Sequence, residues 1–299
     1  LWQLMDFQPF HDEAVRMLRE INILVPELIS NYSNAIITSS NYTEKEKSFK
    51  RFSAFWKNTM DKTGEIDPYL AQINKLGLFM MIEFLDDENP LLRHASKNWL
   101  VDSIGFLDKI IDPLVEDMIC NTTFYCSEGG QFFFTEKYDT AKVFGRFKKL
   151  KNILLTITDL FTDFLVKQVL SAKIREHTPN LMENDLLRHD RKEANYFDLL
   201  IVVCIRYIQG QALESLSPSF AKENEKVSSV ACEFFDLMVT TMPEKSIDIA
   251  KYAYKPLLIV QRYAVSNNNF VIQVQLLSLL KFIIFGKNTL NSRDRTGEL

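Results

Sequence analysis

The sequence predicts an all-α protein, a HEAT/armadillo-like α-solenoid built of antiparallel helical hairpins. Apolar residues recur every three or four positions through nearly the whole chain, which is the spacing of one face of a helix. Glycine is scarce, with 9 among 299 residues, whereas nucleotide-binding α/β folds need glycine at tight strand-to-helix turns. Residues that cap helices precede several prolines. Together these features favour helices joined by polar turns.

Helical periodicity is clearest between residues 138 and 176, which we predict to form one unusually long helix. Its apolar positions are Phe144, Phe147, Leu150, Ile153, Leu154, Ile157, Leu160, Phe161, Phe164 and Leu165. We expect further helices at about 8–32, 44–62, 68–85, 90–107, 113–121, 192–211, 219–241, 244–266 and 268–286. The short polar connections between them are typical of antiparallel helical hairpins.

Four of these helices have an explicit start signal. A capping residue stands before a proline at the first helical position, where the missing N–H of proline costs nothing. The pairs are Asp67-Pro68, Asn89-Pro90, Asp112-Pro113 and Ser217-Pro218. We predict that each pair opens a helix.

Polar segments that lack helical periodicity are the predicted loops, at 38–47, 121–131, 177–195 and 266–269. Charge and Pro179 interrupt the helical period in the third of them. We therefore expect a helical-repeat segment at 1–176, a charged connecting loop at 177–195 and a second helical-repeat segment at 196–299. Helices of similar length, capped at pair-like intervals of roughly 35–50 residues, suit a degenerate solenoid. A large compact helical domain is the alternative, and we expect the chain to be a fragment of a longer one.

The net charge of −4 argues against a nucleic-acid binder, because a protein that reads a duplex usually carries a clustered basic excess. The longest apolar runs, 76–85 and 197–208, fall short of the roughly 18 residues that span a bilayer, so we interpret them as buried helix segments. No C-x-x-C pair is present, and we expect the cysteines to be reduced and buried. They are Cys120, Cys126, Cys204 and Cys232.

Residues 89–99 pose the main question of function, because they hold Arg93 and His94 in a chain with few other reactive groupings. Leu92 and Trp99 lie on one predicted helical face, and His94 lies beside that face. No nucleophile motif such as G-x-S-x-G accompanies the histidine. We interpret His94 as a packing or capping residue. An enzyme whose site combines it with carboxylates from neighbouring helices is an alternative.

Metal and cofactor sites have no sequence support. The histidines lack H-E-x-x-H spacing, and neither G-x-G-x-x-G nor G-x-x-x-x-G-K-[ST] occurs. We predict no cofactor, no metal, no small-molecule substrate and no enzymatic activity.

The segment "KVFGRFKKLKN" is the most suggestive charged feature. Its cations are Lys142, Arg146, Lys148, Lys149 and Lys151, and they alternate with Phe144 and Phe147. Such a helix could contact an anionic membrane or a partner, each basic residue contributing about 1 kcal/mol near anionic lipid. The alternative is an ordinary solvated face behind aromatics that continue the core.

The segment "ENPLLRHASKNWLVDSIGFLDKIIDPLVEDMI" resembles a motif of Dopey-family proteins, in which an N-P-L-x-R opening, a helix ending near W-L and a following I-x-D-P-L recur. The matching residues are Asn89, Pro90, Leu91, Arg93, Trp99, Leu100, Ile111, Asp112, Pro113 and Leu114. Residues 196–210 and 274–286 look similar to later helices of that family. Leu92 joins Asn89, Pro90, Trp99, Asp112 and Pro113 as the structural signature that we expect to open and anchor the two helices.

The resemblance implies a non-enzymatic cytoplasmic scaffold, peripherally bound to Golgi or endosomal membranes and active in trafficking. A Mon2-like protein and a lipid flippase are the partners that it implies. An accessory subunit of an ion-channel complex, which is also a long helical solenoid, is the alternative.

Overall fold

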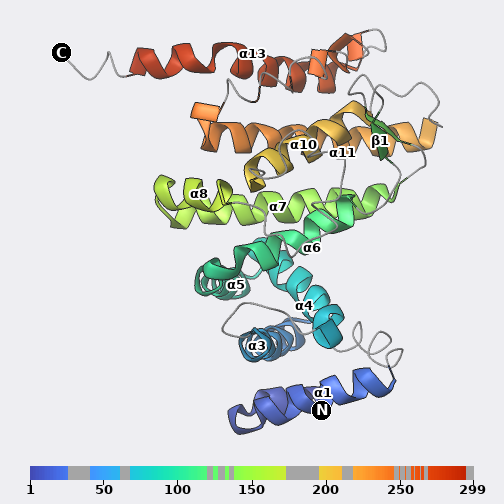
Figure 1. Ribbon diagram of the computed structural model, residues 1–299, viewed down its shortest axis with the longest axis vertical. Helices are drawn as coiled ribbons and strands as arrows, with labels where there is room; N and C mark the ends of the chain where they lie inside the picture. Colours follow the sequence, from blue (N-terminus) through green and yellow to red (C-terminus); the bar gives the residue numbers. More distant parts are fainter. Residues whose placement is uncertain are drawn as a thin grey trace. The chain divides into compact units, whose positions relative to one another are not determined.

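The computed structural model describes residues 1–25, 41–60, 68–119, 124–126, 132–134, 138–172, 195–210, 218–245 and 269–293, with scattered residues between 249 and 265. These residues are mostly helical, which confirms the all-α class (Figure 1). A short antiparallel pair of strands, β1 (Phe124–Cys126) and β2 (Phe132–Phe134), occupies part of the predicted loop at 121–131 and the residues after it. The chain divides into two compact units, Leu1–Pro113 and Leu114–Leu299.

The first unit consists of short helices that pack on their neighbours in sequence. Its α-helices are α1 (His11–Leu24), α3 (Tyr42–Thr59), α4 (Ala71–Glu83) and α5 (Pro90–Asp102). Its 3-10 helices are η1 (Trp2–Asp6), η2 (Gln8–Phe10), η3 (Pro68–Leu70), η4 (Phe84–Asp86) and η5 (Ile104–Phe106). Helix α3 contacts α1 and α4, and α5 contacts η4.

A chain of aromatic rings forms the core of the first unit. Trp2 packs on Phe55 with 5.4 Å between ring centroids, and Trp56 meets Trp99 edge-on at 5.7 Å. Phe52 lies within 6.2 Å of Phe55 and 6.1 Å of Trp56, and it is fully buried. Edge-on and tilted ring pairs are favourable beyond the area that they bury. The rings therefore tie η1, α3 and α5 together.

The close approach of α3 and α4 depends on a glycine. A Cβ added at Gly77 would lie 2.0 Å from two ring atoms of Phe52, which is far inside van der Waals contact. Because Phe52 is fully buried, its ring has little room to move away. Only glycine fits at this contact.

The second unit is built around one long helix, α11 (Pro218–Thr241). Helix α11 contacts α7 (Thr140–Leu160), α8 (Asp163–Leu170), α10 (Tyr196–Gln209), η8 (Pro243–Lys245) and α13 (Phe270–Arg293). Helix α10 is buried along most of its length, as its continuous apolar sequence predicts. The Tyr196 N–H donates to the Ala172 carbonyl at 3.2 Å, so the described residues on either side of 173–194 lie next to one another.

Two of the predicted start signals open helices as expected. The Asn89 side chain accepts a hydrogen bond from the Leu91 N–H at 2.8 Å, with Pro90 at the first position of α5. Pro218 begins α11. Pro68 begins η3, a single 3-10 turn that leads into α4.

The start predicted at Asp112-Pro113 is wrong. Helix α6 (Leu107–Ile119) begins six residues earlier and carries Pro113 in its interior. Its apolar positions continue at helical spacing on both sides of the proline, and burying that stripe outweighs the missing N–H. The buried apolar residues are Leu107, Ile110, Ile111, Leu114, Val115 and Met118.

The single helix predicted at 138–176 is also wrong, because it breaks between α7 and α8. Phe161 and Thr162 both have extended backbone conformations, and the Thr162 carbonyl accepts from the N–H groups of Leu165 and Val166. A threonine followed by an acidic residue is a helix-start pattern that the apolar stripe masked. The predicted core stripe is buried from Phe147 to Ile157, whereas Phe144, Leu160 and Phe164 are exposed.

The loop predicted at 38–47 is wrong from residue 42 onward. Asn41 caps α3, its side chain accepting from the Glu44 N–H at 2.9 Å. The connecting loop predicted at 177–195 and most of the helix predicted at 244–266 lie outside the described residues, as do residues 26–32 of the first predicted helix. The expected division of the chain at 177–195 stays a prediction.

Candidate functional site

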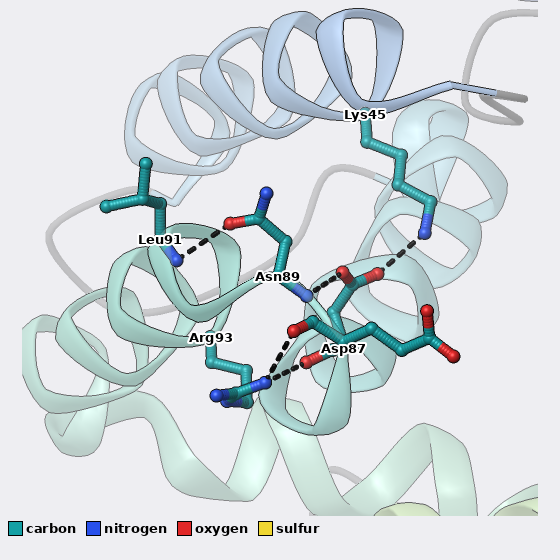
Figure 2. A network of polar contacts seen from close by, with 6 residues as sticks. Lys45, Asp87, Asn89, Leu91 and Arg93 are labelled. Atoms are coloured by element: carbon teal, nitrogen blue, oxygen red, sulfur yellow. Dashed lines mark hydrogen bonds and ion pairs between the residues drawn. The ribbon is translucent and has the colours of Figure 1, made fainter.

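The stretch that begins α5 forms a polar network, which we call the Asp87 network: Lys45, Asp87, Asn89, Leu91 and Arg93. The Asp87 carboxylate accepts from the Lys45 ammonium at 2.6 Å and from the Asn89 N–H at 2.9 Å (Figure 2). The Asn89 side chain in turn caps α5 through the Leu91 N–H. One carboxylate thus fixes both the turn before α5 and its contact with α3.

Arg93 closes the same turn from the other side. Its guanidinium donates to the Asp87 carbonyl at 2.6 Å and to the Glu88 carbonyl at 2.9 Å. Figure 2 shows the arginine reaching back along the chain to these oxygens. The side chain stabilises backbone carbonyls that precede the helix, which is a structural use of the guanidinium.

The electrostatics of Asp87 follow from this geometry. Burial raises the pKa of the carboxyl group. The hydrogen bonds from Lys45 and the Asn89 N–H, with the charges of Lys45 and Arg93, lower this pKa by more than burial raises it. The pKa of Asp87 therefore lies below its ordinary value. The Asp87 network stabilises the charged form of the carboxylate.

His94 lies outside this network. It is exposed, and its Nε2 atom accepts from the Asn98 side-chain amide at 3.1 Å, one turn along the same helix. Leu92, Trp99 and Leu100 are buried, as the predicted helical face requires. The interpretation of His94 as a packing or capping residue is therefore wrong, because the histidine is a surface residue that bonds within α5 itself.

The basic segment of α7 is partly neutralised by acidic residues. The Arg146 guanidinium donates to the Asp117 carboxylate at 3.0 and 2.7 Å, and the Lys142 ammonium lies 3.6 Å from the same oxygen. Lys151 forms an ion pair with Glu233 of α11 at 2.6 Å. These three cations hold α7 against α6 and α11.

The other two cations of the segment lie between these contacts. Lys148 is exposed and Lys149 is half-buried. Phe147 is fully buried, whereas Phe144 is 39% exposed. The aromatic residues therefore do not share one face, and Phe144 lies on the accessible side of α7 with Lys148.

Sequence reasoning missed a buried polar cluster in the second unit. The Tyr138 hydroxyl donates to the Asn224 side chain, whose amide donates to the Gly210 carbonyl at 3.0 Å. The Tyr207 hydroxyl donates to the Met118 carbonyl at 2.8 Å. The Tyr138 and Tyr207 rings meet edge-on with centroids 5.2 Å apart. Burial raises the pKa of both phenols, so they stay protonated and act as donors.

Among the described residues, no three His, Cys, Asp or Glu side chains gather closely enough to hold a metal ion. A search of the same residues finds no helix with the length and apolar character of a membrane span.

Comparison of the chain with family models, with curated proteins and with solved structures finds no match in any of the three.

Proposed function

We propose that this chain is part of a non-enzymatic helical-repeat scaffold that binds other proteins. The packing of successive helices is the observation that supports it. Helix α3 lies between α1 and α4 in the first unit, and α11 lies between α10 and α13 in sequence and contacts both. Stacked helical layers of this kind suit a HEAT/armadillo-like solenoid, whose extended faces bind partners without an enzyme pocket.

A surface on α13 suits such binding. Phe270, Val271, Val274 and Leu277 are between 54% and 70% exposed, while Ile272 and Leu276 on the other side are buried. Exposed apolar side chains that lie together on a surface can mark an interaction site. We call these four residues the α13 face and propose that it contacts a protein partner.

The cellular role that we propose is membrane trafficking, with peripheral association at Golgi or endosomal membranes. The likeness of residues 89–114 to the Dopey-family motif supports this role, and it suggests a Mon2-like protein and a lipid flippase as partners. Lys148 and Phe144, together on the accessible side of α7, are the residues that we expect at an anionic membrane.

Affinity purification of the full-length protein from its native cells, followed by mass spectrometry, tests the role. Recovery of a Mon2-like protein or a flippase is the expected result. Recovery of ion-channel subunits instead would contradict the trafficking role and favour the channel-accessory alternative.

Two variants of the protein test in the same affinity purification whether the α13 face binds the partner. Val274→Glu with Leu277→Glu places charge on the α13 face and should remove the partner from the eluate. Phe164→Glu changes a single exposed aromatic on α8, which is 76% exposed, and should leave recovery unchanged. Equal recovery with both variants would show that the partner binds elsewhere.

A further inference from the structure

Two free, buried cysteines lie on contacting helices of the second unit. Cys204 lies on α10 and Cys232 lies on α11, and these helices are in contact. Both side chains are buried, with 0% and 2% of their surface exposed. Both thiols are therefore shielded from solvent in the folded protein.

Hydrogen bonds across the interface give the register of the two helices. The Asn224 side chain donates to the Gly210 carbonyl at 3.0 Å, and the Ser228 hydroxyl donates to the Tyr207 carbonyl at 2.9 Å. A step of one turn forward along α11, from Asn224 to Ser228, corresponds to a step of one turn back along α10, from Gly210 to Tyr207. This is the pattern of antiparallel helices. The next turn brings Cys232 opposite Cys204.

The electrostatics agree with this register. Burial raises the pKa of the Cys204 thiol well above its ordinary value, and the nearby Cys232 raises it further. Burial likewise raises the pKa of Cys232. Since the thiolate is the nucleophile in sulfur chemistry, both groups are inert while the helices are packed.

A metal site at Cys204 and Cys232 has less support than disulfide chemistry. A structural zinc site takes four ligands, of which two thiolates supply half. Among the described residues, no third His, Cys, Asp or Glu lies close enough to complete such a group. Chemistry that needs only two sulfurs fits the pair better.

We propose that Cys204 and Cys232 are a redox-sensitive modification site, which forms an inter-helix disulfide with a low-molecular-weight disulfide oxidant such as oxidised glutathione. Opening of α10 from α11 exposes one thiol to solvent and allows it to ionise. The proposal is independent of the scaffold role and of the partners proposed above.

The reaction balances in two exchange steps. The exposed thiolate attacks one sulfur of oxidised glutathione, whose disulfide breaks and releases one glutathione thiolate. As the helices close, the second cysteine loses its proton and attacks the mixed disulfide, which releases the second glutathione thiolate. Two protein thiols are oxidised, one glutathione disulfide is reduced, and two protons leave the protein thiols.

The experiment uses the full chain with Cys120→Ser and Cys126→Ser, so that the two buried cysteines are the remaining thiols. The protein is incubated with oxidised glutathione, blocked with iodoacetamide and mapped by mass spectrometry. We expect an intramolecular Cys204–Cys232 disulfide that forms faster in low urea, since urea favours opening. The crosslink should raise the melting temperature by about 5–10 °C, and reduction should reverse the shift.

Cys204→Ala in the same background is the matched control, and it should acquire glutathione at Cys232 without a change in melting temperature of that size. If the native protein does not react, the oxidant is instead present during refolding from urea. A Cys204–Cys232 disulfide in the refolded chain supports the proposal. Glutathione adducts on both cysteines, or disulfides only between chains, would overturn it.

Discussion

At the scale of residues, Gly77 lies at a position of the first unit that has no room for a side chain. A methyl group there would overlap the Phe52 ring, which is fully buried. Glycine in a helix costs about 0.5–1 kcal/mol of stability relative to alanine. Helix propensity therefore disfavours glycine at position 77, and the contact with Phe52 requires it.

We therefore expect Gly77→Ala to lower the free energy of unfolding by about 1–3 kcal/mol, as overpacked cores do. Urea unfolding followed by circular dichroism measures the change. Gly145→Ala is the matched control, because no atom lies within 4 Å of a Cβ at that position of α7. It should be neutral or stabilising by up to about 1 kcal/mol. A neutral Gly77→Ala would show that Phe52 can move.

Trp99 and His94 lie five residues apart on α5 and differ in burial. Trp99 is 5% exposed and packs edge-on against Trp56, whereas His94 is exposed beside Asn98. Trp99→Ala should cost about 3–5 kcal/mol of stability through the cavity that it leaves. His94→Ala should change stability by less than about 0.5 kcal/mol. Thermal melts of the two variants that shift by equal amounts would contradict this assignment.

At the scale of elements, the Asp87 network couples the start of α5 to α3. The pKa of Asp87 is lowered on folding, so the folded protein binds its proton less readily than the unfolded chain does. The contribution of the carboxylate is therefore complete above its ordinary pKa of 3.8 and is lost as the pH falls below that value through the folded pKa.

Asp87→Asn should lower the free energy of unfolding by about 1–2 kcal/mol at pH 7, because it removes the ion pair with Lys45 but keeps an acceptor for the Asn89 N–H. The difference from wild type should shrink when urea melts are repeated near pH 3. Glu88→Gln removes a neighbouring exposed carboxylate and should have little effect at either pH. A pH-independent difference would mean that the charge of Asp87 is not the stabilising feature.

The start of α5 was predictable from sequence, because Asn89 and Pro90 act through their nearest neighbours. Helix α6 was not, since the buried stripe from Leu107 to Met118 overrides the local signal of Pro113. The prediction of one helix across Phe161 failed for the opposite reason. There, a local helix-start pattern interrupts an apolar stripe that looked continuous in the sequence. The ion pairs of Asp87 with Lys45 and of Asp117 with Arg146 join residues that are 42 and 29 positions apart in the sequence. No short-range sequence pattern could predict either pair.

At the scale of the whole molecule, the basic segment contributes both to helix packing and to surface charge. Lys142, Arg146 and Lys151 hold helices together through Asp117 and Glu233, so their removal would disturb the fold. Lys148 and Lys149 carry the other two charges of the segment, and Lys148 is exposed.

We expect Lys148→Glu with Lys149→Glu to weaken binding to phosphatidylserine vesicles by about tenfold or more, since each basic residue near such a surface contributes about 1 kcal/mol. Vesicle flotation at low and high salt measures the change, and wild-type binding should fall as salt rises. Lys222→Glu, at an exposed position of α11, is the control and should bind as wild type does. Salt-independent binding, or equal binding of all three proteins, would remove the membrane from the proposed role.

The hydrogen bond between Tyr196 and Ala172 has a practical consequence for building reporters. Because Ala172 and Tyr196 are hydrogen-bonded to each other and α8 contacts α10, the described residues on either side of 173–194 are held together by their own contacts. The entropy of closing a loop grows only slowly with its length. We therefore expect a fluorescent protein or an epitope inserted midway between residues 173 and 194 to leave the contact of α8 with α10 unchanged.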